Sequence, residues 1–138
     1  MITKKAGTVL INIESKKIAL VDRNDFKGLE FPKGHLEEGE TLQQCAIRET
    51  EEETQRKNHL FEEKELNRVR YVTSKGEDVE LYIYLSIDDG PTEKNIKEHD
   101  KEEWIWVDFD KVEESLVFQN LIDFWKESKD IIKEKLSI

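Results

Sequence analysis

Apolar and polar residues alternate or cluster along the chain in patterns typical of strands. Residues 6–13 (AGTVLINI) are apolar and β-branched, and they predict a strand whose hairpin partner is residues 18–21. Residues 68–73 (RVRYVT) alternate, residues 79–87 (VELYIYLSI) form the strongest strand pattern, and residues 103–109 (EWIWVDF) predict a further strand. We therefore expect at least five strands, distributed over the whole chain.

Two stretches have the pattern of helices. Residues 42–54 contain no Gly or Pro, and Thr41 lies three residues before Gln44, which predicts a capping box at the start of a helix. Residues 116–136 predict a long amphipathic helix. Its expected apolar positions are Leu121, Ile122, Phe124 or Trp125, Ile131, Ile132 and Leu136.

The remaining segments connect these elements. Residues 74–78 predict a hairpin turn, and residues 110–115 predict a short helix or turn. Residues 88–100 predict a loop, whereas residues 56–66 are charged and ambiguous. The order of strands and helices predicts an α/β protein with a mixed sheet between helices. With 138 residues, the chain has the length of one domain, and we expect that domain to span residues 1–138.

The helix predicted over residues 42–54 has an inward face whose chemistry changes halfway along. At about 100° per residue, this face carries three apolar residues and then three carboxylates: Leu42, Cys45, Ala46, Glu49, Glu52 and Glu53. Grouped carboxylates repel one another unless a cation neutralises them. Oxygen ligands at this spacing suit Mg²⁺, with Mn²⁺ as a substitute. The alternative is a solvated helix face. Cys45 is expected to pack rather than react.

The charge of the chain limits its partners. Lys and Arg number 22 against 32 Asp and Glu, so the net charge is −10, which argues against non-specific binding of nucleic acid. The same charge repels a phosphate substrate, and a bound divalent metal is the simplest remedy. The chain has one cysteine and no run that resembles a signal peptide or a membrane span. We therefore expect a cytoplasmic protein without a membrane partner; its oligomeric state stays open.

The loop before this helix and the helix itself share a fixed spacing, G-x5-E-x7-R-E-x-x-E-E. Its fixed positions are Gly34, Glu40, Arg48, Glu49, Glu52 and Glu53. This pattern resembles the signature of the Nudix hydrolases, which implies a Nudix-like α/β/α sandwich with a mixed central sheet. Gln55 and Arg56 depart from the family pattern, in which a Gly and an aliphatic residue are usual after the helix.

The resemblance also implies roles for individual residues. Metal ligands would be Glu49, Glu52, Glu53 and the main-chain carbonyl of Lys33. Gly34 and Glu40 would be structural, and Arg48, which can pair with Glu40, would orient the glutamates. The reaction implied is hydrolysis of a diphosphate link in a nucleotide derivative. The base would be Glu52 or an acidic residue just before the strand that contains Trp104; Glu103 fits best there, with Glu98 and Glu102 as rivals.

Substrate-binding residues are predicted on both sides of this loop. Lys33 and His35 flank Gly34 and could hold phosphate oxygens. The alternatives are solvent exposure for Lys33 and a bond from His35 to the backbone. Tyr82 and Tyr84 could line a base-binding cleft by stacking, or they could cover the sheet beneath a helix.

The segment FPKGHLEEGET resembles the variant found in diadenosine tetraphosphate and diphosphoinositol polyphosphate hydrolases. His99, which follows Glu98, is similar to the His of a Glu-His pair in the former, or else is a plain loop residue. We therefore predict a dinucleoside polyphosphate as the substrate. The alternatives are a nucleoside triphosphate, a nucleotide sugar such as ADP-ribose, an RNA 5′ end, or a non-catalytic nucleotide-binding module. Glu30 resembles a Glu in enzymes that act on ADP-ribose.

Overall fold

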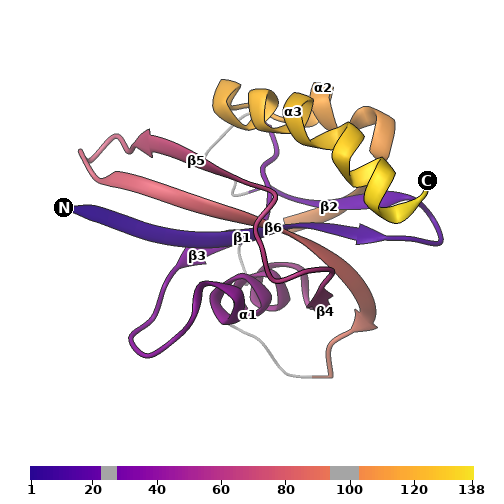
Figure 1. Cartoon of the computed structure of the whole chain (residues 1–138), viewed down its shortest axis with the longest axis horizontal. Helices are drawn as coiled ribbons and strands as arrows, with labels where there is room; N and C mark the ends of the chain where they lie inside the picture. Colours follow the sequence, from indigo (N-terminus) through magenta and orange to yellow (C-terminus); the bar gives the residue numbers. More distant parts are fainter. Residues whose placement is uncertain (23–27, 94–102) are drawn as a thin grey trace.

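A parallel pair of long strands forms the centre of the sheet (Figure 1). The computed structural model describes residues 1–22, 28–93 and 103–138. Within them, β1 (Ile2–Asn12) runs beside β6 (Asp78–Pro91) in continuous register from Ile2↔Asp78 to Ile11↔Ile87. Both strands are rich in aliphatic residues, and β6 also contains two tyrosines, as is typical of a pair covered on both faces.

Each central strand has two antiparallel partners that share its outer edge. β3 (Lys33–His35) pairs with the first half of β1, and β2 (Lys17–Asp22) pairs with its end. In the same way, β5 (Asn67–Val72) pairs with the first part of β6, and β4 (Arg56–Leu60) pairs with its second part. β7 (Glu103–Asp108) extends the sheet beyond β2. The sheet is therefore mixed, as the sequence predicted.

Helices cover both faces of this sheet (Figure 1). α1 (Leu42–Thr54) packs on one face. A 3₁₀ turn η1 (Phe109–Lys111), α2 (Val112–Ser115) and α3 (Gln119–Leu136) lie on the other. The predicted α/β/α arrangement is confirmed. Within the described ranges, no helix is long and apolar enough to cross a membrane.

The larger core cluster lies on the α3 face of the sheet. Trp125 is buried, with its ring centroid 4.9 Å from that of Phe109 and 6.1 Å from that of Phe31. Phe124 is also buried, so both candidates for this apolar position face the core. Ile131 is 45% exposed, so its predicted inward position is wrong. The centre of the buried stripe of α3 is formed by Leu121, Trp125, Ser128 and Ile132, at i, i+4, i+7 and i+11, and Ile131 lies to one side of it.

The smaller cluster lies beneath α1, and it contains both candidate stacking tyrosines. Tyr82 and Tyr84 pack against Ala6, Cys45 and Ala46 and are 6% and 2% exposed. Small residues on the helix and on β1 let α1 approach the sheet closely enough to cover the rings. Neither ring therefore has an open face for a nucleobase. The substrate-binding role predicted for Tyr82 and Tyr84 is wrong, and the packing alternative holds.

Two boundaries differ from the sequence predictions because charges pair across strands. The ambiguous segment after α1 contains β4, and residues 88–91 of the predicted loop continue β6. Arg56 donates from Nε and Nη2 to the Asp88 carboxylate at 2.8 and 2.7 Å, and His59 Nδ1 lies 2.8 Å from Asp89 Oδ2. These cross-strand partners come from distant parts of the chain, so the charge pattern of one segment does not reveal them.

Candidate active site

The capping of α1 fixes the start and end of the helix that carries the candidate ligands. Thr41 Oγ1 accepts the N–H of Gln44 at 3.1 Å, and Gln44 Oε1 accepts the N–H of Thr41 at 2.9 Å, so the predicted capping box is confirmed. At the other end Gln55 adopts a left-handed conformation with φ 57° and donates its N–H to Glu51 O. Gln55 thus takes the helix-ending conformation in which a glycine is usual.

β3 and the second half of α1 lie in direct contact. Glu53 Oε1 accepts the main-chain N–H of Lys33 at 2.8 Å. A Cβ atom built on Gly34 would come closer than 3.0 Å to the carboxylate of Glu49, a separation that real Cβ atoms essentially never show. The absence of a side chain at position 34 therefore leaves room for the Glu49 carboxylate in its present position. Glu49 and Glu53 are both buried, as the inward stripe predicted.

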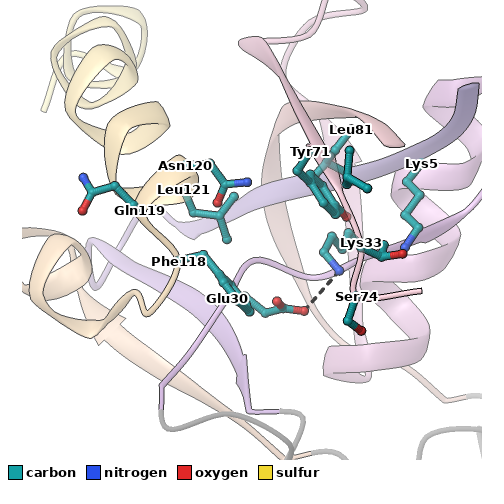
Figure 2. Close-up of a pocket in the computed structure, with 12 residues that line it drawn as sticks. Lys5, Glu30, Lys33, Tyr71, Ser74, Leu81, Phe118, Gln119, Asn120 and Leu121 are labelled. Atoms are coloured by element: carbon teal, nitrogen blue, oxygen red, sulfur yellow. Dashed lines mark ion pairs between the residues drawn. The ribbon is translucent and has the colours of Figure 1, made fainter. Parts of the chain in front are cut away.

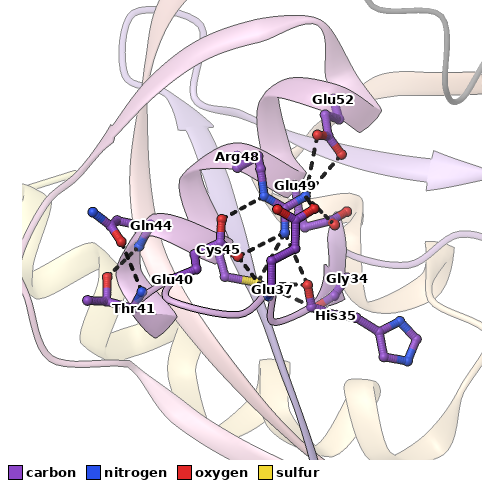
Figure 3. Close-up of polar contacts among 10 residues, drawn as sticks. All are labelled: Gly34, His35, Glu37, Glu40, Thr41, Gln44, Cys45, Arg48, Glu49 and Glu52. Atoms are coloured by element: carbon purple, nitrogen blue, oxygen red, sulfur yellow. Dashed lines mark hydrogen bonds and ion pairs between the residues drawn. The ribbon is translucent and has the colours of Figure 1, made fainter.

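Arg48 is the centre of a polar network on this side of α1 (Figure 3). Its Nε and Nη2 donate to the two oxygens of Glu40 at 2.7 and 2.9 Å, which confirms the predicted pair. Its Nη1 donates to Glu49 Oε1 at 2.8 Å and to Glu52 Oε2 at 3.2 Å. Nη2 also donates to the carbonyl oxygen of His35 at 3.1 Å. Arg48 therefore ties the loop to two of the predicted metal ligands.

The network sets the protonation of its members. Hydrogen bonds from Arg48 lower the pKa of Glu40 below its usual value, although partial burial opposes this shift. Burial, together with the nearby negative charge of Glu40, raises the pKa of Cys45 to about 12. The thiol is therefore protonated at neutral pH. Its Sγ lies 3.6 Å from Gly34 O and 3.5 Å from His35 O, in reach to donate to either carbonyl. Cys45 packs, as expected.

The carboxylate oxygens of these glutamates suit a hard divalent cation, but in this arrangement N–H groups of the protein already bond to them. Glu49, Glu52 and Glu53 offer oxygens alone, which Mg²⁺ and Mn²⁺ prefer. In the described part of the chain, no three His, Cys, Asp or Glu side chains converge into a ready metal-binding group. Arg48 holds Glu49 and Glu52, and Lys33 N–H holds Glu53. A cation would share or displace these bonds, so the ligand assignment, with the Lys33 carbonyl, stays a prediction.

The predicted base also stays open. Glu103 begins β7 opposite Asp22, and its side chain is exposed. Within residues 1–22, 28–93 and 103–138, no hydrogen bond or ion pair joins Glu103 to the glutamates of α1. Glu98, Glu102 and His99 lie outside the described residues.

The two predicted phosphate-binding side chains point to different surroundings. Lys33 Nζ lies 3.2 Å from Oε1 of the buried Glu30, so Lys33 is not simply a solvent-exposed residue. His35 is largely exposed, and its Nε2 lies 3.6 Å from Glu77 Oε1. In Figure 3 the His35 ring points away from the Arg48 network. Of these two residues, Lys33 is the one that reaches both sides of the sheet: its main chain contacts the glutamates of α1, and its side chain lies on the α3 side.

A pocket of about 530 Å³ lies on the α3 side of the sheet, between strands β1, β3, β5 and β6 and the start of α3 (Figure 2). Its apolar walls include Tyr71, Leu81 and Phe118, and charged groups of Lys5, Glu30 and Lys33 lie along its edge. No motif in the sequence marks Tyr71 or Phe118 as a binding residue. Tyr71 alternates within a recognised strand, and Phe118 precedes a helix, but nothing local shows that the two approach one cavity.

Comparison with known proteins shows the same architecture. Residues 1–134 match the sequence model of the NUDIX domain family. The structure of a C. elegans Ap4A hydrolase superposes with a TM-score of 0.73 at 21% identity, covering 96% of this chain and 99% of that one. A MutT protein from Methanosarcina mazei Go1 gives 0.72 at 16% identity, covering 96% of each chain. A NUDIX hydrolase from Nitrosomonas europaea gives 0.66 at 17%, covering 92% and 88%.

The family match spans nearly the whole chain and includes the loop, the helix and the Arg48 network described above. The neighbouring structures named as hydrolases align with at least 92% of this chain, which shows that they share its fold. This chain therefore belongs to the NUDIX domain family.

Proposed function

We propose that this protein hydrolyses a dinucleoside polyphosphate, with diadenosine tetraphosphate as the best candidate, and requires Mg²⁺ or Mn²⁺. Water would attack one phosphorus, and the bond from that phosphorus to a bridging oxygen would break to give ATP and AMP. The observation that carries the proposal is the double role of Lys33. Its main-chain N–H bonds Glu53, while its side chain lines the pocket on the opposite face of the sheet.

The pocket is suited to a base and the neighbouring edge to phosphates. Its volume of about 530 Å³ is within the range of small-molecule sites, and its walls are mainly apolar. The aromatic residues Tyr71 and Phe118 in these walls can pack against a flat ring. Lys5 and Lys33 then supply positive charge between the base and the glutamates of α1. The C. elegans protein of similar fold is named an Ap4A hydrolase, which agrees with this substrate class.

The residues of the chain would divide the work as follows. Glu49, Glu52, Glu53 and the Lys33 carbonyl would hold the cation, and Arg48 would keep Glu49 and Glu52 in place. A bound divalent cation would neutralise the charge that develops on phosphate oxygens in the transition state. Glu52 or Glu103 would accept the proton of the attacking water. Lys33 would bind a phosphate oxygen in exchange for its contact with Glu30.

A hydrolysis panel tests the proposal. Diadenosine tetraphosphate, ADP-ribose, nucleoside triphosphates and a diphosphoinositol phosphate are each incubated with the protein and Mg²⁺ or Mn²⁺, and the products are separated by chromatography. Glu53→Gln is run beside the wild type and is expected to lose about 10²-fold or more in kcat. Glu51→Gln is the matched control, since Glu51 lies on the same helix but accepts a bond from Thr92 Oγ1.

The outcomes separate the alternatives. Cleavage of diadenosine tetraphosphate to ATP and AMP by the wild type and by Glu51→Gln, with loss in Glu53→Gln, supports both substrate class and metal site. Preference for ADP-ribose or a nucleoside triphosphate would overturn the substrate class and leave the metal site standing. Binding of nucleotides without cleavage would favour the non-catalytic module.

A further inference from the structure

The pocket beside Lys33 has mainly apolar walls with polar side chains among them, and most of these polar side chains are engaged within the protein. The polar wall side chains with hydrogen-bond or ion-pair partners are Lys5, Glu30, Lys33, Thr73 and Gln119. Polar groups in an otherwise apolar pocket orient the ligand and determine its identity. A wall group without such a partner is therefore a candidate for recognition of a base.

Asn120 is such a group. It lies in the first turn of α3, half-buried, in the wall of the pocket. In Figure 2 its side chain extends from the helix toward Tyr71, whereas Gln119 points away from the pocket. Gln119 Nε2 instead donates to Asp123 Oδ1 at 2.9 Å. Across the described ranges, the Asn120 amide makes no hydrogen bond to another residue.

The chemistry of an amide selects among purines. Its oxygen accepts the N6 amino proton of adenine while its nitrogen donates to N7, so both groups are satisfied together. Guanine presents two acceptors, O6 and N7, at the same edge. The amide nitrogen could donate to one of them, but the amide oxygen would then face the other acceptor with no proton between the two atoms. A base whose faces pack against Tyr71 and Phe118 would present its ring edge to the amide of Asn120.

We infer that Asn120 is a specificity residue that makes the pocket select adenine over guanine. This inference rests on the proposed function for the placement of the phosphates, and it concerns the base alone. One bidentate amide–adenine contact is expected to give about a tenfold preference for adenine.

The test compares diadenosine and diguanosine tetraphosphates as substrates. kcat and KM are measured for the wild type, Asn120→Ala and Asn120→Asp, and binding of AMP and GMP to the same proteins is measured by calorimetry. Asn120→Asp keeps the shape of the side chain but removes the donor. Asn67→Ala is the matched control, because its amide donates to Glu127 Oε2 and lies outside this pocket.

The wild type and Asn67→Ala are expected to prefer adenine about tenfold in kcat/KM and in binding. In Asn120→Ala the preference is expected to fall to about twofold or less, through a higher KM for the diadenosine substrate and little change in kcat. Asn120→Asp still accepts an N6 proton of adenine and faces two acceptors on guanine, so it is expected to keep a preference for adenine. Equal kcat/KM for the two substrates in the wild type, an unchanged ratio in Asn120→Ala, or loss of the preference in Asn120→Asp would overturn the inference. Thermal unfolding checks that each variant is folded.

The calorimetric arm keeps this result separate from the proposed reaction. If no dinucleoside polyphosphate is split, the proposed function fails, yet a preference for AMP over GMP that Asn120→Ala abolishes still supports the base selection. If diadenosine tetraphosphate is split and AMP and GMP bind equally, the reaction stands and the role of Asn120 falls.

Discussion

Replacing Gly34 by alanine tests whether the contact between β3 and α1 sets the position of Glu49, a carboxylate that we propose holds the cation. The new Cβ would come closer than 3.0 Å to the Glu49 carboxylate, whereas ordinary contacts begin at 3.4 Å. The atoms that it meets are the far end of a flexible side chain, so the carboxylate can retreat without moving the backbone. That retreat would break the bond from Arg48 Nη1 to Glu49 Oε1, now 2.8 Å long.

The size of the effect follows from this geometry. The carboxylate must move by on the order of 1 Å, and a misplacement of that size costs about 10²-fold in rate. The free energy of unfolding is expected to fall by roughly 1–3 kcal/mol, since the buried Glu49 carboxylate loses one charged hydrogen bond while the backbone stays in place. Gly34→Ala should therefore be a folded protein with about 10²-fold lower kcat and a higher Mg²⁺ requirement.

The assay measures kcat at increasing Mg²⁺ concentration, with urea unfolding on the same samples. Gly76→Ala is the contrasting control: Gly76 has φ 82° and nothing within 4 Å of the site of a Cβ. Alanine there is expected to cost about 1 kcal/mol of stability and to leave kcat unchanged. Near-wild-type kcat for Gly34→Ala at ordinary Mg²⁺ would refute the reasoning, because the Glu49 carboxylate would then not need its present position.

Three further predictions concern the fold. Gln55→Gly relieves a left-handed non-glycine residue and should raise the free energy of unfolding by roughly 0.5–1 kcal/mol with kcat unchanged. Trp125→Ala empties a buried site and should lower that free energy by about 3–5 kcal/mol, measured by urea unfolding. Asp88→Asn should cost roughly 2 kcal/mol at pH 7, because it weakens the charged bonds from Arg56. Burial alone would raise the pKa of Asp88, but bonds from Arg56 and Asn12 lower it overall.

The sign of the pH dependence follows from that lowered pKa. The stabilising effect of ionised Asp88 is present above its unfolded value of 3.8 and is lost as the pH falls through the lower folded value. The deficit of Asp88→Asn relative to the wild type should therefore shrink below about pH 3.8. A deficit that is constant from pH 7 to pH 2 would contradict this account, as would an unchanged stability for Gln55→Gly or Trp125→Ala.

Local signals in the sequence were sufficient for the helix that carries the site. Residues 42–54 fold as predicted, because the capping residues, the absence of Gly and Pro and the apolar stripe all act within a few turns. The pairing of Arg48 with Glu40 was predictable for the same reason. The mixed sheet followed from the order of elements, whereas β4 and the end of β6 did not, because their charges are satisfied by partners from other segments.

The sequence by itself therefore determined the family, the position of the carboxylates and the arrangement of helices around a sheet. Only the tertiary structure decided which aromatic side chains line a pocket and which are covered. Tyr82 and Tyr84 are covered by α1, whereas Tyr71 and Phe118 meet in one pocket although 46 intervening residues separate them. The physical reason is that alternation assigns each side chain to a face of the sheet, but what covers that face depends on packing between distant segments.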